Sequence, residues 1–589
     1  MQGCPPSPNT RNTPAFRAAI SLALAALALL AALPSHRRSV AAAARPAPSL
    51  TNPDQACARC HSAIYNSYRQ TSMARGSGLA TDALETGAFT HTPSGVTYRI
   101  FLREAAAWMS FDRTPFGPVA ASLHGERELS YFIGSGHRGR TYLYQIDGEW
   151  FELPINFYTR QNALRMAPAY DSVTSMPAPL PVDPNCLHCH ATAVQPSLPS
   201  ARNRFLGGTP FTQAGIGCSA CHGDPSAHLA DPTHNTILNP AKLSPARRDS
   251  TCLQCHLEGD AVVYRPGRSL AQFRPGDDLA DTAVYFVRAS QAAGGSRATS
   301  QYEALLRSAC KAGSGDRLTC TTCHDPHSSP APASRVSYFR AKCLSCHTSP
   351  ALATTHHPEQ PDCAICHMPS RNTADISHEQ VTDHNIQRRP ASPPFQLATV
   401  QHTEDLVPIG PAQASAREFG PAYAQMAQRG DIRAGEKALH LLTAAEAAQP
   451  NTPDPDLHTQ LGFLNQISGN AAAARSEYAA ALAANPFQTT ALGNLAVLEA
   501  ASGHAGEAVR LLTRLIDADP SQTAAGLNLA YIECQIRQRD AARALLAELA
   551  RFNPDDPQLR TFQRTGAYSG SHCDLGPNPS PDPASHAQR

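Results

Sequence analysis

The sequence has almost no net charge and lacks clusters of basic residues. Its 589 residues include 49 basic and 48 acidic ones, so the formal net charge at pH 7 is +1. It contains neither a basic run nor a stripe that combines basic and aromatic residues, and those patterns are typical of chains that bind nucleic acid. We therefore expect no nucleic acid partner.

Long apolar stretches are almost absent as well. The main example runs from Ala18 to Leu33, is 16 residues long, follows Arg11 and Arg17, and precedes small residues at 41–44. This order is typical of a secretory signal. We predict a signal peptide over residues 1–44 and a periplasmic or otherwise exported protein. An uncleaved leader that anchors the chain in the membrane stays open as an alternative, because the stretch is only slightly shorter than a bilayer-spanning helix.

The most informative feature that the sequence does have is a pentapeptide that occurs seven times. In each copy two residues separate two cysteines, and a histidine follows the second cysteine directly. The copies, called motifs 1 to 7 in chain order, hold 14 of the 18 cysteines: Cys57 and Cys60, Cys186 and Cys189, Cys218 and Cys221, Cys252 and Cys255, Cys320 and Cys323, Cys343 and Cys346, and Cys363 and Cys366. Their histidines are His61, His190, His222, His256, His324, His347 and His367.

This pentapeptide is the attachment site of haem c. Two thiols at this spacing add across the two vinyl groups of a haem, and the next histidine turns its ring onto the iron as proximal ligand. Seven cysteine pairs that are each followed by histidine match zinc ligand sets poorly, and disulfides would not explain the histidine. We predict seven covalently attached haems with their iron. Of the other cysteines, Cys4 lies in the leader, and Cys310, Cys534 and Cys573 are too scattered to be proposed as pairs.

The second axial position of each iron decides whether a haem only carries electrons or also performs chemistry. A second histidine or a methionine closes that position, and methionine gives the higher reduction potential. The residues selected as distal ligands are His228, His327, His378, His384, His137, His124, His91 and Met73. For His91, His124 and His137 a surface or loop position is a close alternative. His188, between the cysteines of motif 2, is either exposed or bound to another haem.

The spacing of the motifs divides the chain into regions. The motifs span a predicted haem domain at 51–387. The long gap between motifs 1 and 2 shows short alternating strands and an Asp147-Gly148 hairpin signal. We predict a small antiparallel β insert at about 89–155 in an otherwise irregular, mainly α cytochrome domain. Residues 388–414 are rich in proline and are predicted to form a linker.

Beyond the linker the sequence repeats itself every 34 residues. The interval is kept by a proline and by a leucine: Pro486, Pro520 and Pro554, and Leu461, Leu495 and Leu529. This period is the tetratricopeptide repeat pattern. We predict an all-α solenoid at 415–560 whose concave face docks a partner, with simple packing on the haem domain as the alternative. The tail at 566–589 is predicted to be disordered.

Several segments resemble a known family. Residues 57–74 look like the opening of the cytochrome c-552 and c-554 type of multihaem cytochromes, although histidine often stands there in place of Met73. Residues 217–228, 318–327 and 363–369 are similar to bacterial multihaem cytochromes fused to tetratricopeptide repeats. The resemblance implies periplasmic electron transfer through closely stacked haems, most of them six-coordinate.

The leading hypothesis is an exported heptahaem electron carrier whose solenoid docks a redox partner protein. The alternative is an oxidoreductase that acts on a small nitrogen or sulfur compound at one five-coordinate haem. No motif replaces its histidine by lysine, as the pentahaem nitrite reductases do. A third hypothesis makes the repeats the working part and the haems a sensor or anchor. We expect an electron-transfer protein rather than a catalyst and assign no catalytic residue.

Overall fold

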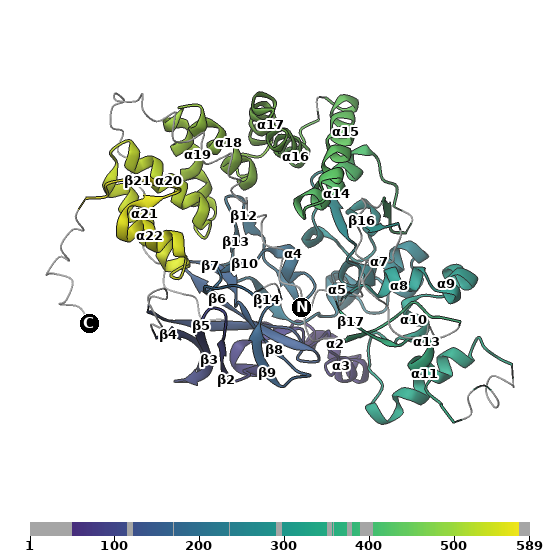
Figure 1. The fold of residues 1–589 in the computed structure, drawn as a ribbon. Coiled ribbons are helices and arrows are strands. Elements are labelled where there is room, and N and C mark those ends of the chain that lie inside the picture. Colours follow the sequence, from purple (N-terminus) through teal and green to yellow (C-terminus); the bar gives the residue numbers. More distant parts are fainter. Residues whose placement is uncertain are drawn as a thin grey trace.

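The computed structural model describes residues 50–576 except 115–121, 169, 235, 290–296, 298, 350–355, 357–358, 374–379, 389–404, 411 and 451. The predicted signal peptide and most of the predicted linker lie outside this part. Among the described residues, no helix combines the length and apolar character needed to cross a bilayer. The chain forms a large sheet, a group of short helices that carry the motifs, and a helical solenoid that extends over both (Figure 1).

A ten-stranded antiparallel sheet lies between motifs 1 and 2. Its main path is β10-β7-β6-β5-β4-β3-β2, with β1 paired to β5 and β8 paired to β6 and β9. The strands are β1 (Ser77–Leu79), β2 (Gly87–His91), β3 (Val96–Arg103), β4 (Ala106–Arg113), β5 (Leu123–Ile133), β6 (Gly139–Ile146), β7 (Glu149–Glu152), β8 (Ile155–Tyr158), β9 (Ala163–Met166) and β10 (Leu180–Pro181). In the predicted hairpin turn, Asp147 and Gly148 have φ angles of 52° and 87°, as such a turn requires.

The centre of this sheet is buried on both faces. Tyr142 and Tyr144 of β6 belong to one apolar cluster, while Leu143 between them belongs to a second cluster that includes Trp150. Successive side chains of a strand point to opposite faces, so β6 joins two cores. The prediction of a mainly α domain with a small β insert is therefore only partly right. Strands such as β1, β8 and β10 are too short for their alternation to be visible in the sequence.

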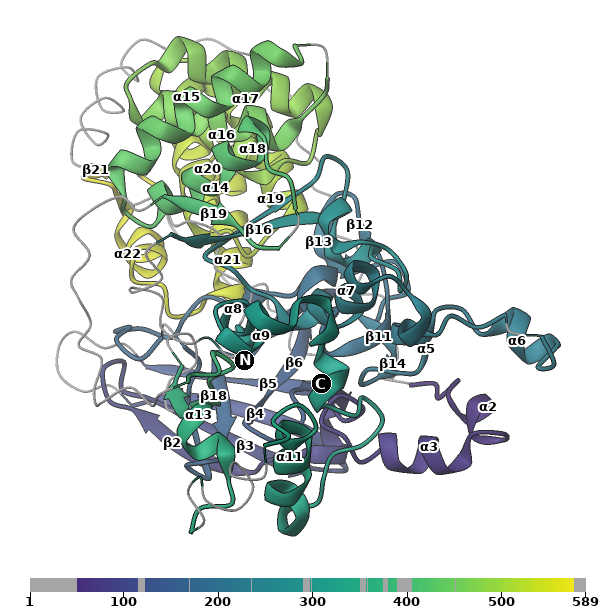
Figure 2. The ribbon, with the colours of Figure 1, turned by 90° about the vertical axis from the view of Figure 1, so that its right-hand side faces the viewer.

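The haem motifs and the segments between them form short helices beside this sheet. These helices are α2 (Gln55–Ala58), α3 (Ser62–Tyr68), α4 (Pro184–Leu187), α5 (Ser219–His222), α6 (Ser226–Ala230), α7 (Pro245–His256), α8 (Gln301–Leu306), α9 (Ala309–Ser314), α10 (Cys320–Cys323), α11 (Arg335–Leu344) and α13 (Cys363–His367). Small strand pairs join them: β11 (Ala191–Val194) with β14 (Phe211–Ala214), β12 (Ser197–Leu198) with β13 (Ala201–Phe205), and β17 (Ser370–Asn372) with β18 (Gln380–Thr382). Helices α2, α3, α5 and α6 lie on one side of the molecule (Figure 2).

The C-terminal region is a series of antiparallel helix pairs. Its helices are α14 (Ala416–Gln428), α15 (Ile432–Ala448), α16 (Pro455–Ile467), α17 (Ala471–Ala484), α18 (Thr489–Ala501), α19 (Ala505–Ala518), α20 (Thr523–Gln535), α21 (Arg539–Phe552) and α22 (Pro557–Thr565). The small residue at the repeated position is needed for close packing. At Gly462 a Cβ atom would lie 2.6 Å from the ring of Tyr478, and the equivalent Ala496 and Ala530 are fully buried.

The N-terminal end of the solenoid packs on a three-stranded sheet next to the motif helices. This sheet comprises β15 (Ala261–Tyr264), β16 (Ala283–Arg288) and β19 (Leu406–Pro408). The Gln425 amide of α14 donates to the Val262 carbonyl at 2.8 Å, and the Arg417 guanidinium donates to the Tyr264 carbonyl at 3.0 Å. Because β19 falls at 406–408, the predicted linker contains a strand of this sheet.

The C-terminal end of the solenoid packs on the large sheet (Figure 1). Arg113 of β4 forms two bonds to the Asp555 carboxylate, at 2.6 and 2.9 Å, and Asp555 also binds Arg560 at 2.9 Å and the Met176 amide at 2.7 Å. The Arg113 and Asp555 side chains are only 6% and 1% exposed. The Phe552 ring lies 5.9 Å from the Phe151 ring. The solenoid is thus attached to the haem domain at both ends.

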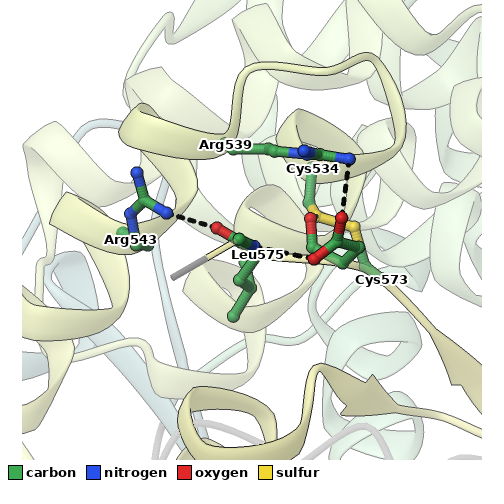
Figure 3. The surroundings of a disulfide bond; sticks show 7 residues. Cys534, Arg539, Arg543, Cys573 and Leu575 are labelled. Atoms are coloured by element: carbon green, nitrogen blue, oxygen red, sulfur yellow. Dashed lines mark hydrogen bonds and ion pairs between the residues drawn. A yellow bond between two sulfur atoms is a disulfide. The ribbon is translucent and has the colours of Figure 1, made fainter. Parts of the chain in front are cut away.

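The prediction of a disordered tail from residue 566 is wrong for residues 566–576. They form the hairpin β20 (Ala567–Tyr568) and β21 (Ser571–His572), which packs on α22 through Tyr568 and Phe562. A disulfide joins Cys573 to Cys534 of α20, and Asp574 binds Arg539 at 3.0 Å (Figure 3). The expectation that these cysteines are too scattered to pair is also wrong, because the hairpin turns the chain back onto α20.

We expect Asp555→Ala to lower the free energy of unfolding by about 3–5 kcal/mol, because it leaves Arg113 and Arg560 without their buried counter-ion. Chemical denaturation followed by circular dichroism measures the effect. The control is Asp112→Ala, which removes an exposed partner of Arg99 and should cost less than about 1 kcal/mol. Equal losses in the two variants would contradict the role of Asp555.

We expect Cys573→Ser to lower the free energy of unfolding by about 2–4 kcal/mol, because the disulfide no longer restricts the unfolded chain. Thermal unfolding with and without a reductant measures this. A reductant should lower the midpoint of the natural protein more than that of the variant, which lacks the Cys534–Cys573 bond. Cys310→Ser, at a cysteine that is free in the structure, is the control and should leave the effect of the reductant unchanged.

Candidate haem-binding sites

Each motif forms about one helical turn. The backbone amide of the motif histidine donates to the carbonyl of the first motif cysteine in motifs 1, 3, 5 and 6, at 2.9 to 3.0 Å. Residues four apart lie on the same face of a helix. The first thiol and the imidazole therefore project from one side of the turn, which is what a group tethered and ligated by the same pentapeptide requires. Thirteen motif cysteines are free thiols, and Cys186 is disulfide-bonded.

Direct contacts connect motifs 1, 3, 4 and 2. Asp54, just before motif 1, accepts a hydrogen bond from the Cys218 amide of motif 3 at 3.2 Å. The Cys57 thiol lies near Cys218, and burial together with Asp54 raises the pKa of Cys218 to about 12. Gln254 of motif 4 binds the His188 ring of motif 2 at 2.7 Å and the Ala220 carbonyl of motif 3 at 3.4 Å.

Further contacts continue from motif 4 to motif 7. The Cys320 thiol of motif 5 lies close enough to the Cys252 thiol of motif 4 to lower the pKa of Cys252. The His324 ring of motif 5 packs edge-on against Phe339, on the helix that carries motif 6, with 5.6 Å between ring centres. Arg340 of the same helix reaches the Cys363 sulfur of motif 7 at 3.9 Å. All seven motifs thus form one array of neighbouring sites.

Three motif histidines face a second histidine. The ring centres are 5.9 Å apart for His222 and His327, 6.2 Å for His324 and His384, and 6.1 Å for His367 and His356. A metal ion takes an imidazole nitrogen at about 2.0–2.1 Å, so two imidazoles on opposite sides of one ion have ring centres about 6 Å apart. Each gap therefore has the size that one iron ion needs.

Backbone carbonyls fix the orientation of these imidazoles. The Nδ1 atom of His222 lies 2.8 Å from the Leu238 carbonyl oxygen, that of His367 lies 2.6 Å from Gln387, and that of His384 lies 2.9 Å from Thr382. A carbonyl accepts only from a protonated nitrogen, so Nε2 carries the free lone pair. That tautomer is the one that ligates a metal through Nε2, and such outer hydrogen bonds orient ligand rings.

The surroundings of the motifs also fit a large apolar group. Ile365, between the two cysteines of motif 7, is 59% exposed, Ile64 on α3 is 46% exposed, and Leu229 on α6 is 49% exposed. A porphyrin beside the motifs would cover such side chains. Burial lowers the pKa of His190 to about 4. This imidazole is therefore neutral at pH 7, as metal binding requires.

Some of the sequence-selected distal ligands fit these sites and others do not. His327 and His384 each face a motif histidine. His91 does not fit, because it is buried in the sheet and its ring nitrogens bind the Ser94 hydroxyl at 2.9 Å and the Asp171 carbonyl at 3.1 Å. His124 is exposed in β5, where the sheet holds it opposite Asp112.

The remaining candidates are less constrained. His137 is exposed in a loop next to Arg138, whose charge acts on His256 of motif 4. His228 is half-buried on α6, and its Nδ1 atom is enclosed without a hydrogen-bond partner among the described residues. Met73 is half-buried in a turn after α3, and its carbonyl accepts from the Ile216 amide. His378 lies outside the described residues.

Sequence reasoning did not select two residues that the structure brings into the sites. His356 precedes motif 7 in a polar segment, and its only sequence signal is that it stands close to Cys363. Gln254 occupies a spacer position of motif 4, where the sequence pattern accepts any residue. His188, left open between exposure and ligation, instead has its Nε2 atom hydrogen-bonded to Gln254.

Comparisons with known proteins agree with these features. The family model of cytochrome c554 and c-prime matches residues 159–223, that of the doubled CXXCH motif matches 312–352, and that of the tetratricopeptide repeat matches 499–564. The resemblance to multihaem c-type cytochromes with C-terminal tetratricopeptide repeats is confirmed, and so is the prediction of helical repeats. No functionally curated protein matches the chain.

Solved structures with a measurable likeness include both kinds of protein. The outer cell wall cytochrome OcwA is 15% identical, with 78% of this chain and 98% of that chain covered and a TM-score of 0.38. A tetratricopeptide repeat protein from Parabacteroides merdae is 22% identical over 25% of this chain, with a TM-score of 0.22, and the match spans 56% of that protein. TTC0263 from Thermus thermophilus is 17% identical, with 24% and 79% covered and a TM-score of 0.21.

Proposed function

We propose that this protein is an exported heptahaem electron carrier. In this proposal each motif tethers one haem c through its two thiols, and the haems, numbered like the motifs, form a continuous path for electrons. The observation that carries the proposal is the single array of seven neighbouring motifs. Export is proposed because covalent haem attachment is a property of c-type cytochromes, which are assembled outside the bacterial cytoplasm.

The facing imidazoles support six-coordinate iron at three sites. We assign His222 and His327 to haem 3, His324 and His384 to haem 5, and His367 and His356 to haem 7. Haem iron supplies reversible one-electron transfer when it is bound. The residues of the chain would hold both axial positions, and backbone carbonyls fix the tautomer of His222, His367 and His384. A closed axial position favours electron transfer over binding of a substrate.

The solenoid is proposed as a docking module for a redox partner protein. Tetratricopeptide repeats commonly present a concave face to a partner. Because both ends pack on the haem domain, a partner held there would be fixed relative to the haems. We assign residues 51–387 to the haem domain and 415–560 to the solenoid, with the strand at 406–408 joining them.

The first test is the mass of the mature protein from its native host. We expect the chain plus seven haems, and peptide mapping should find haem on every motif. The critical peptide is the one with motif 2, because Cys186 must be free for attachment. A bare chain would overturn the proposal. Six haems with an unmodified motif 2 would restrict the function to a hexahaem carrier.

The second test concerns the axial pairs. We expect His327→Ala to convert one haem from low-spin to high-spin iron, since haem 3 loses its sixth ligand. Electron paramagnetic resonance of the oxidised protein measures this. His124→Ala, at the exposed position in β5, should leave the spectrum unchanged. A His327→Ala spectrum that stays entirely low-spin would refute the pairing of His222 with His327.

A further inference from the structure

The helix that carries motif 4 differs from the other motif helices. In α7 the side chains of Asp249, Ser250, Thr251, Leu253 and Gln254 are buried, whereas α2, α5, α10, α11 and α13 have no buried residue. Helix α7 is therefore packed more deeply in the protein than these five motif helices, while α4 of motif 2 buries one residue, Leu187. At this position in the array, motif 4 can be contacted by several other motifs.

One side chain makes most of these contacts. Gln254 is 6% exposed, and its Oε1 atom lies 2.7 Å from Nε2 of His188, so it accepts a hydrogen bond from motif 2. Its Nε2 atom donates to the Ala220 carbonyl of motif 3 at 3.4 Å and to the Thr251 carbonyl of its own helix at 2.9 Å. Its own carbonyl accepts from the Cys189 thiol at 3.7 Å.

The two thiols of motif 4 face different neighbours. The Cys255 sulfur is close enough to Cys189 of motif 2 to shift its pKa, and the Cys252 sulfur is likewise close to Cys320 of motif 5. Motif 4 thus touches motif 2, motif 3 and motif 5. Since each haem is tethered to its thiols, the distances between tethers constrain the distances between haems.

We propose that Gln254 is a positioning residue that holds motifs 2 and 3 against motif 4 and thereby makes haem 4 the junction of three electron routes. One route leads through haem 3 to haem 1, one leads to haem 2, and one leads through haems 5 and 6 to haem 7. The inference rests on the proposed electron-carrier function and adds a branched connectivity to it.

The amide is suited to this role because it offers an acceptor and a donor at once. A buried polar group without hydrogen-bond partners destabilises the folded protein. The Gln254 amide therefore favours the arrangement in which motifs 2 and 3 both stay in contact with motif 4. A methionine has the same length without hydrogen bonds, and a glutamate keeps the acceptor for His188 but loses the donor for Ala220. The two substitutions therefore separate the contacts.

The experiment compares Gln254→Met, Gln254→Glu and Ser345→Met in the full-length holoprotein. Ser345 is the matched control, since it has the same spacer position in motif 6, is exposed, and donates to the Lys342 carbonyl of its own helix. Mass analysis first counts the haems. Electron paramagnetic resonance then measures magnetic coupling between haems, and flash reduction measures internal electron equilibration.

We expect all three variants to carry as many haems as the natural protein. Gln254→Met should lose the coupling of haem 4 to haems 2 and 3 and show an additional slow phase after flash reduction. Gln254→Glu should lose only the coupling to haem 3, and Ser345→Met should match the natural protein. If Gln254→Met does not mature, the Gln254→Glu result decides.

If both Gln254 variants show the same magnetic coupling between haems and the same electron equilibration as the natural protein, the inference is overturned. The electron-carrier function would remain intact. Absence of haem from the natural protein is the separate outcome that removes the proposed function itself.

Discussion

The structure depends on one covalent constraint, which is that each motif must present two thiols and an imidazole within five residues. A single helical turn meets this requirement, and a turn of that length buries almost nothing by itself. The helices α2, α5, α10 and α13 therefore cannot form a core. The largest apolar clusters lie instead in the ten-stranded sheet and in the solenoid, and the motif helices α4 and α7 contribute Leu187 and Leu253 to smaller clusters.

The two rigid parts are connected so that they act as one frame. At one end α14 continues the packing of the β15-β16-β19 sheet, and at the other end Asp555 joins the solenoid to β4 through a buried ion pair. Removing one partner of such a buried ion pair is strongly destabilising, so this pair ties the end of the solenoid to the sheet. A solenoid fixed at both ends holds its concave face in a constant position relative to the motifs. This geometry suits the docking of a partner at a defined distance from the electron path.

The features that could be predicted from the sequence are those with a fixed period or a fixed spacing. The pentapeptides and the 34-residue repeat belong to this class, and so does the Asp147-Gly148 turn. The large sheet was underestimated because β1, β8 and β10 are too short to show alternation. The disulfide between Cys534 and Cys573 was missed because it depends on the hairpin at 567–572. His327 stands three residues after a motif histidine and was selected from that spacing, while His356 and Gln254 depend on contacts between segments that no spacing rule describes.

The hydrogen bonds around the imidazoles explain how a chain of short, exposed turns can bind its cofactors in a defined order. An imidazole whose Nδ1 proton is held by a backbone carbonyl has already lost much of its rotational freedom, so ligation of iron orders little more of the chain. His222, His367 and His384 share this arrangement although they come from three different segments. The carbonyls belong to Leu238, Gln387 and Thr382, which lie in segments outside the motifs themselves. Leu238 lies between motifs 3 and 4, while Thr382 and Gln387 follow motif 7. Segments outside the motifs therefore supply the groups that decide which imidazole nitrogen would face the iron.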